Sequence, residues 1–247
     1  MVNKLKPKKR YRRGYAVVIL AGIEKDSTAL WKVFSNVVKP EKTLHINGAR
    51  SNSKDLYNFH ESLVNALRPT LKEGVRSVIL ASPARTNYHQ EFINHVDEHH
   101  KWLTQGVNKA AFSKITGSAT TPHQVAALTR TQTFRQLISK TTKEETENLI
   151  EILDKRINTT DNDNLVLFSL EEAEKLVLRR RKPSKPKSDY LMLTNKYLAE
   201  TRQRNRLHRL IEIAINKKVK TRIISADTPA GKRLTQLGGF VCLAQLD

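Results

Sequence analysis

The sequence predicts an α/β protein with two α/β domains, each a mixed sheet flanked by helices, preceded by a basic flexible N-terminal arm. Strand-like apolar runs alternate with helix-like apolar stripes from about residue 14 onward. The last 29 residues, 219–247, hold a strand, a capped helix, a glycine stop and a second strand. A polar, asparagine-rich stretch without periodicity, 158–164, separates the two halves. We therefore expect an arm at 1–13 and domains at 14–157 and 164–247.

The first domain is expected to begin with an antiparallel meander of three strands. These strands are predicted at residues 15–20, 28–38 and 43–46. A helix follows, capped by Ser51 or Ser53 and ended by Pro69. Its apolar residues share one stripe, at Leu56, Phe59, Leu63 and Leu67.

The rest of this domain alternates strands with helices. Residues 75–83 are nearly all apolar after Ser77, which predicts a strand covered on both faces. The helix expected at 87–103 turns three apolar residues inward, namely Phe92, Val96 and Leu103. A strand at 110–115 and a polar turn at 116–121 follow, and Pro122 opens a long helical region.

The second domain repeats the alternation. A helix begins near Ser169 with Glu171 and Glu172 in its first turn, where the helix dipole favours acids. A strand is expected at 190–194, a helix at 202–217 with Leu207, Leu210, Ile211 and Ile215 inward, and a strand at 219–224. Asp227 or Thr228 is expected to cap the last helix, with Pro229 as its first residue. Gly238 and Gly239 are expected to end this helix, and a buried strand is expected at 240–243. The alternation predicts mostly parallel central strands with right-handed crossovers.

The charge indicates a polyanionic partner. The chain has a formal net charge of +20 and a pI near 10.1. Seven basic residues without an acid fill the arm, at Lys4, Lys6, Lys8, Lys9, Arg10, Arg12 and Arg13. A proline-containing insert at 179–187 adds Arg179, Arg180, Arg181, Lys182, Lys185 and Lys187. We predict that both segments contact RNA phosphates.

Several other features limit the function classes. No apolar stretch approaches the roughly 18 residues of a membrane span, so no membrane partner is expected. The lone Cys242 cannot form an internal disulfide and is expected in the core, which fits a reducing compartment and a cytoplasmic location. No phosphate-binding glycine loop is present, so we expect no nucleotide cofactor.

Four histidines gather near one expected helix, at His89, His95, His99 and His100. His95 and His99 are four residues apart and lie on one helical face, a spacing that suits a metal. Neither an HExxH pattern nor a nearby cysteine accompanies them. The expectation is therefore a solvated polar face without a metal.

Three segments in one order resemble a known family. The strand at 75–83 ends in Ala-Ser-Pro and precedes a helix that closes on Asp97-Glu98-His99-His100. The segment 112–117 precedes Val125 and Leu128, and the segment 222–243 holds Ser225-Ala226-Asp227, Gly231, Leu234 and Leu237-Gly238-Gly239. These segments resemble the central and third domains of Pelota, a relative of the class 1 release factors of archaea and eukaryotes. Pelota begins with an Sm-like domain, and we expect this chain to differ because it has no room for such a domain before residue 14. The short basic arm occupies that position instead.

Release factors of this superfamily carry Gly-Gly-Gln in the central-domain loop. The matching loop here contains no such motif; its candidate residues are Gly117, Ser118, Thr120, Thr121, His123 and Gln124. A glutamine amide is no general base near neutral pH, so we expect Gln124 to be a helix residue without a catalytic part. We also expect Pro122 to start that helix.

The resemblance implies a ribosome-binding translation factor that acts in ribosome rescue, quality control or idle-ribosome occupancy. It implies binding to rRNA and tRNA, and a protein partner that is an EF-Tu-like translational GTPase or the ribosome-recycling ATPase. The residues leave two alternative functions open. One is a peptidyl-tRNA hydrolase that uses Gln124, and the other is a general RNA-binding protein that reuses the fold.

Overall fold

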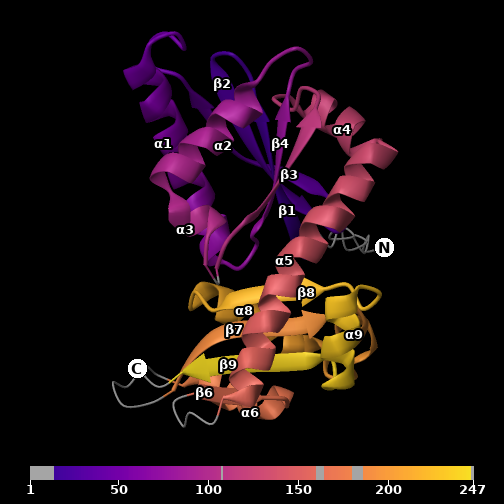
Figure 1. Cartoon of the computed structure of the whole chain (residues 1–247). Helices are drawn as coiled ribbons and strands as arrows, with labels where there is room; N and C mark the ends of the chain where they lie inside the picture. Colours follow the sequence, from indigo (N-terminus) through magenta and orange to yellow (C-terminus); the bar gives the residue numbers. More distant parts are fainter. Residues whose placement is uncertain (1–13, 107, 160–163, 180–185, 246–247) are drawn as a thin grey trace, which may run out of the picture.

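The computed structural model describes residues 14–106, 108–159, 164–179 and 186–245 of the chain. Two mixed sheets lie one above the other in Figure 1, with helices packed against each sheet. The long helix α5 (Gln132–Asn158) runs from the upper sheet down beside the lower one. The predicted fold class, α/β with two mixed sheets flanked by helices, is confirmed.

The upper sheet has five strands in the order β3-β2-β1-β4-β5. Their bounds are β1 Ala16–Ile23, β2 Ser27–Phe34, β3 Val38–His45, β4 Ser77–Ser82 and β5 Ala111–Thr116. The first three form the predicted antiparallel meander, and β1, β4 and β5 are parallel neighbours. All of β4 is buried, as its apolar sequence predicts for a strand covered on both faces.

Helices cover both faces of this sheet. On one face lie α1 (Ser53–Lys72), α2 (Tyr88–His99) and α3 (Lys101–Thr104), and on the other lie α4 (Pro122–Arg130) and the first part of α5. Two apolar layers result. Ile19 and Leu80 pack against α1 and α2 on one side, whereas Leu20 and Ile79 pack on the α4 and α5 side.

Some predicted helix ends in this half are wrong. Asn52, not Ser51 or Ser53, caps α1, because its side chain accepts hydrogen bonds from the amides of Lys54 and Asp55. Pro69 lies inside α1, which continues to Lys72. Burial of the flanking Leu67 and Leu71 compensates for the hydrogen bond that proline cannot donate.

Two predicted continuous helices are interrupted. The helix expected at 87–103 breaks at His100, whose φ of −130° and ψ of 50° lie outside the helical region. The helical region after Pro122 breaks at Thr131, whose hydroxyl accepts from the amide of Phe134 and so caps α5. The inward positions Phe92, Val96 and Leu103 are buried as predicted.

The lower sheet has four strands in the order β6-β9-β7-β8. Their bounds are β6 Asn164–Leu167, β7 Lys187–Thr194, β8 Lys220–Ile224 and β9 Phe240–Gln245. The expectation of parallel central strands is wrong here, since β9 is antiparallel to both β6 and β7. Phe240, the first residue of β9, pairs with Leu193 at the same end of the sheet where β8 stops. The connection through α9 therefore crosses β7 without running back along the strands, and β9 enters the sheet antiparallel.

The helices of this half are α6 Leu170–Leu178, α7 Asn195–Glu200, α8 Arg204–Asn216 and α9 Pro229–Gln236. Ser169 is the N-cap of α6, so this helix begins where it was predicted to begin. Thr228, one of the two predicted candidates, is the N-cap of α9, whereas α7 was not predicted. Ile215 was expected inward and is 37% exposed, because α8 turns Leu207, Leu210 and Ala214 to the sheet instead.

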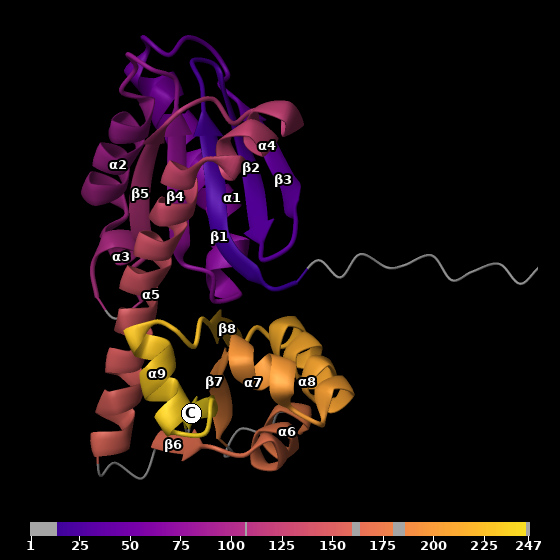
Figure 2. The ribbon, with the colours of Figure 1, turned by 90° about the vertical axis from the view of Figure 1, so that its right-hand side faces the viewer.

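The second core draws on α5. Leu149, Ile152 and Leu153 of this helix pack with Met192 and Leu234 against the lower sheet. Figure 2 shows the lower end of α5 beside α9. The predicted boundary at 158–164 stays a prediction, and residues 160–163 lie outside the described part of the chain.

Cys242 lies in β9 and is fully buried, as predicted for a core residue. Burial raises the pKa of its thiol to about 11, which keeps the thiol protonated near neutral pH. Among the described residues, no helix has the length and apolar character of a membrane span.

Candidate functional site

The loop between β5 and α4 is held against the upper sheet. The Trp31 indole Nε1 donates a buried hydrogen bond of 2.7 Å to the Ala119 carbonyl. Gly22 of β1 lies directly beneath, where an added Cβ would stand 2.3 Å from the same carbonyl oxygen. Only glycine allows the loop backbone to approach β1 this closely. The loop is therefore packed on the sheet and does not project from it.

Gln124 is fixed at the start of α4. Its Oε1 accepts from the amides of Thr120 and Thr121, at 3.0 Å each, and from the Thr120 hydroxyl at 2.9 Å. The Thr121 hydroxyl accepts in return from the Gln124 amide, which completes a capping box with Pro122 in the first turn. Of the other loop candidates, Gly117 and Ser118 are half-buried and His123 is exposed.

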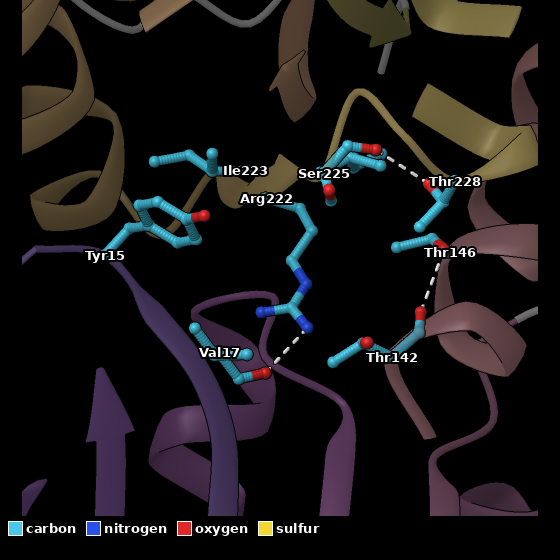
Figure 3. A pocket seen from close by; sticks show the side chains of 9 residues that line it. Tyr15, Val17, Thr142, Thr146, Arg222, Ile223, Ser225 and Thr228 are labelled. Carbon is cyan, nitrogen blue, oxygen red and sulfur yellow. Dashed lines mark hydrogen bonds between the residues drawn. The ribbon is translucent and has the colours of Figure 1, made fainter. Parts of the chain in front are cut away.

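The two sheets are joined by a buried arginine. Arg222 of β8 donates to the carbonyls of Ala16 (2.9 Å) and Val17 (2.8 Å) at the start of β1. Figure 3 shows its side chain extending from β8 toward Val17. The same guanidinium forms a 2.5 Å ion pair with Glu145 of α5, and both side chains are almost completely buried. Glu145 also accepts from the Arg76 amide, at 3.1 Å, and from the Ser77 hydroxyl.

The space around Arg222 is a small pocket of about 70 Å³. Tyr15, Thr142, Thr146 and Thr228 are among its lining residues (Figure 3). Burial raises the pKa of the Tyr15 hydroxyl, and the charge of Arg222 opposes that shift. Small-molecule sites usually enclose roughly 300–1,000 Å³, so the pocket around Arg222 is too small for such a ligand. The contacts of Arg222 therefore serve to hold the two sheets together.

A second set of contacts joins the halves on the side of α3. The Thr221 amide donates to the Glu73 carbonyl at 2.9 Å, and Lys220 Nζ donates to Asn108 at 3.2 Å. Tyr190 also donates to Asn108 through its hydroxyl. Both contact sets involve β8, which supplies Lys220, Thr221 and Arg222 to these contacts between the halves.

A larger pocket lies next to this junction and was not foreseen from the sequence. It encloses about 330 Å³ between the end of α1 and α3, and its lining includes Arg68, Lys72, Arg76 and Trp102. Trp102 is 43% exposed, and the Arg68 guanidinium lies 5.2 Å from its ring centroid. Within the described residues, Arg68 Nε and Arg76 Nε and Nη1 are buried without a hydrogen-bond partner. Cationic side chains that line a pocket beside an exposed indole suit an anion attached to an aromatic ring.

The predicted RNA-binding residues are only partly visible. The seven arm residues and Arg180, Arg181, Lys182 and Lys185 lie outside the described residues. Arg179 and Lys187 are exposed at the two ends of the insert, as predicted for solvent-facing cations. Their role in binding stays a prediction.

The expectation of solvated histidines is wrong for two of the four. His95 and His100 are 7% and 8% exposed, because α1 packs over the junction of α2 and α3. Both rings contact the Glu61 carboxylate. The His89 ring forms a hydrogen bond with the Ser82 hydroxyl, and His99 is partly exposed beside Glu98.

Comparison with solved structures places this fold beside a group of translation factors. Ribosome-bound archaeal Pelota, described together with ABCE1, superposes with a TM-score of 0.52 at 17% identity, over 97% of this chain and 64% of that chain. Dom34 of S. cerevisiae, a translation termination-like factor, superposes with a TM-score of 0.48 at 16% identity, over 96% of this chain and 64% of that chain. Archaeoglobus fulgidus Pelota superposes with a TM-score of 0.40 at 16% identity, over 99% of this chain and 71% of that chain.

No family model and no curated protein matches the chain. The chain spans less than two thirds of the length of Dom34 and of the ribosome-bound archaeal Pelota. Over nearly all of its own length it has the fold of the matched part of archaeal Pelota, so the resemblance seen in the sequence is confirmed for the fold.

Proposed function

We propose that this protein is a ribosome-binding translation factor that resembles Pelota and acts in ribosome rescue, quality control or idle-ribosome occupancy. The observation that carries the proposal is the superposition of 97% of the chain on archaeal Pelota in its ribosome-bound form. The net charge of +20 supports it, because rRNA and tRNA present dense phosphate surfaces to a bound factor.

The proposed RNA contacts fall into two kinds. The basic arm and the 179–187 insert would neutralise phosphates without regard to sequence. The pocket beside Trp102 would take a phosphate on Arg68 or Arg76 and stack an unpaired base on the indole. Together they favour a folded RNA with splayed bases over a plain duplex, and ribosomal RNA offers such sites.

The partner proposal follows the same resemblance. Archaeal Pelota is described on the ribosome together with ABCE1. We propose that the lower α/β unit contacts the ribosome-recycling ATPase or an EF-Tu-like translational GTPase.

Sedimentation with ribosomes tests the main proposal. We expect the full chain to pellet with ribosomes, and to stay bound when total tRNA is added in excess as a competitor. A chain that tRNA or a synthetic RNA strips from ribosomes would instead be a general RNA-binding protein. A density map of the complex would then identify the ribosomal state that is bound.

A Gln124→Ala variant separates a binding factor from a hydrolase. Three hydrogen bonds hold Gln124 Oε1 on its own helix start, so we expect neither wild type nor variant to release peptide from ribosome-bound peptidyl-tRNA. Loss of the capping box should lower the free energy of unfolding by about 0.5 to 2 kcal/mol. Release by the wild type but not by an equally folded variant would establish the hydrolase.

A further inference from the structure

Half of the histidines in the chain meet in one place between α1 and the α2–α3 junction. The chain has eight histidines, and four of them, His60, His95, His99 and His100, form a contiguous set of rings. The His95 ring is central, with centroids 5.1, 4.9 and 5.4 Å from those of His60, His99 and His100. Nothing in the proposed ribosome binding requires this cluster.

Two of these imidazoles converge on one carboxylate. The Nε2 atoms of His95 and His100 lie 3.2 and 2.5 Å from the same Glu61 oxygen. The three potential ligand atoms all lie within 4.8 Å of one another. Ligand atoms around a tetrahedral zinc ion, bound at about 2.0–2.1 Å, are roughly 3.4 Å apart. Shifts of an ångström or so would therefore place all three around one ion.

The break between α2 and α3 is what creates this convergence. Five residues along a continuous helix correspond to a rotation of about 140°, so His95 and His100 would face different directions. The non-helical backbone of His100 ends α2 and turns the ring to Glu61, beside His95. His99, which has the favourable i, i+4 spacing from His95, is instead directed to Glu98 at 3.6 Å.

Burial and openness in this cluster suit an ion. His95 and His100 are almost fully buried, whereas the Glu61 side chain is 27% exposed and leaves a path to solvent. The neighbouring His60 is 97% buried and its Nε2 has no hydrogen-bond partner among the described residues.

We propose that Glu61, His95 and His100 form a site for one divalent transition-metal ion, with zinc as the best match and solvent as the fourth ligand. Two imidazoles and one carboxylate are a frequent protein ligand set for zinc with an open position. The ion would join α1 to the α2–α3 junction and hold the helical break in place. This proposal is independent of ribosome binding, and its test does not use ribosomes.

The test uses the full chain without a histidine tag, stripped with a chelator and titrated with zinc sulfate against a colorimetric chelator. We expect one zinc ion per chain. His95→Gln and His100→Gln should each weaken binding by about a hundredfold or more. His99→Gln is the matched control, since it removes an adjacent ring outside the ligand set, and it should change the affinity less than threefold.

Two further measurements guard against variants that simply fail to fold. Zinc in large excess should raise the melting temperature of the wild type and of His99→Gln by about 5 °C, and leave His100→Gln unchanged. Cobalt in place of zinc should give a visible absorption band that Glu61→Gln alters. The proposal is overturned if the wild type binds no stoichiometric zinc, or if folded His95→Gln and His100→Gln variants bind as the wild type does.

Discussion

An Arg222→Met variant is expected to lose about 3 to 5 kcal/mol of unfolding free energy, because it leaves the Glu145 carboxylate buried without its cation. The guanidinium also satisfies two carbonyls of β1, at Ala16 and Val17, and these would lose their donor. Methionine fills similar volume, so the loss reflects charge and hydrogen bonding more than an empty cavity. We expect the contacts between the two sheets to loosen first.

Urea unfolding of a double-mutant cycle measures this effect. Combining Arg222→Met with Glu145→Gln should recover part of the loss, since no buried charge is then left alone. The control is Arg233→Met, which breaks the exposed pair with Asp154 at the surface of α5 and α9 and should cost at most about 1 kcal/mol. Equal losses from Arg222→Met and Arg233→Met would show that the buried network contributes little.

Removal of residues 1–13 is expected to weaken ribosome binding by about a hundredfold at low salt and to make it less dependent on salt. The arm carries seven basic residues and no acid. Each phosphate contact contributes about 0.7 to 0.9 to the slope of log affinity against log salt concentration. If all seven contact phosphates, the slope should fall by about 5 to 6.

Charge-matched variants decide whether the arm acts through charge alone. Replacing its four lysines with arginine keeps the charge and should keep the slope, whereas glutamine at all seven positions should reproduce the deletion. Affinity is measured by sedimentation over a range of potassium chloride concentrations. An unchanged slope after deletion would contradict the phosphate-binding role.

Local signals predicted most of the elements of this fold. The apolar run before Ser82, the capping Ser169 and the Thr228-Pro229 helix start all lie where the sequence placed them. Each depends on nearest neighbours along the chain, so propensity and periodicity suffice. The cap of α1 was missed because three polar residues compete within 51–53, and only the backbone geometry of Asn52 allows its side chain to reach the amides.

The candidate sites were less predictable. Gln124 could be placed at a helix start, since Pro122 and Thr121 stand beside it in the sequence. The Trp102 pocket could not be predicted, because its arginines come from the end of α1 and from the segment before β4. Neither segment carries a nucleic-acid motif. The histidines were assigned to a solvated face because neither an HExxH pattern nor a cysteine accompanies them, and the local sequence does not show that α1 packs over the α2–α3 junction and buries His95 and His100.

The sequence by itself determined the α/β class, the antiparallel meander, the starts of α4, α6 and α9, and the strong basic charge, since each follows from composition or from short-range patterns. Only the tertiary structure decided which elements are partners. It placed β9 antiparallel between β6 and β7, extended α5 along both sheets, and joined Arg222 to Glu145 across 77 positions. It also brought Glu61 to His95 and His100. Periodicity reports that a side chain is buried, whereas its partner depends on how distant segments pack.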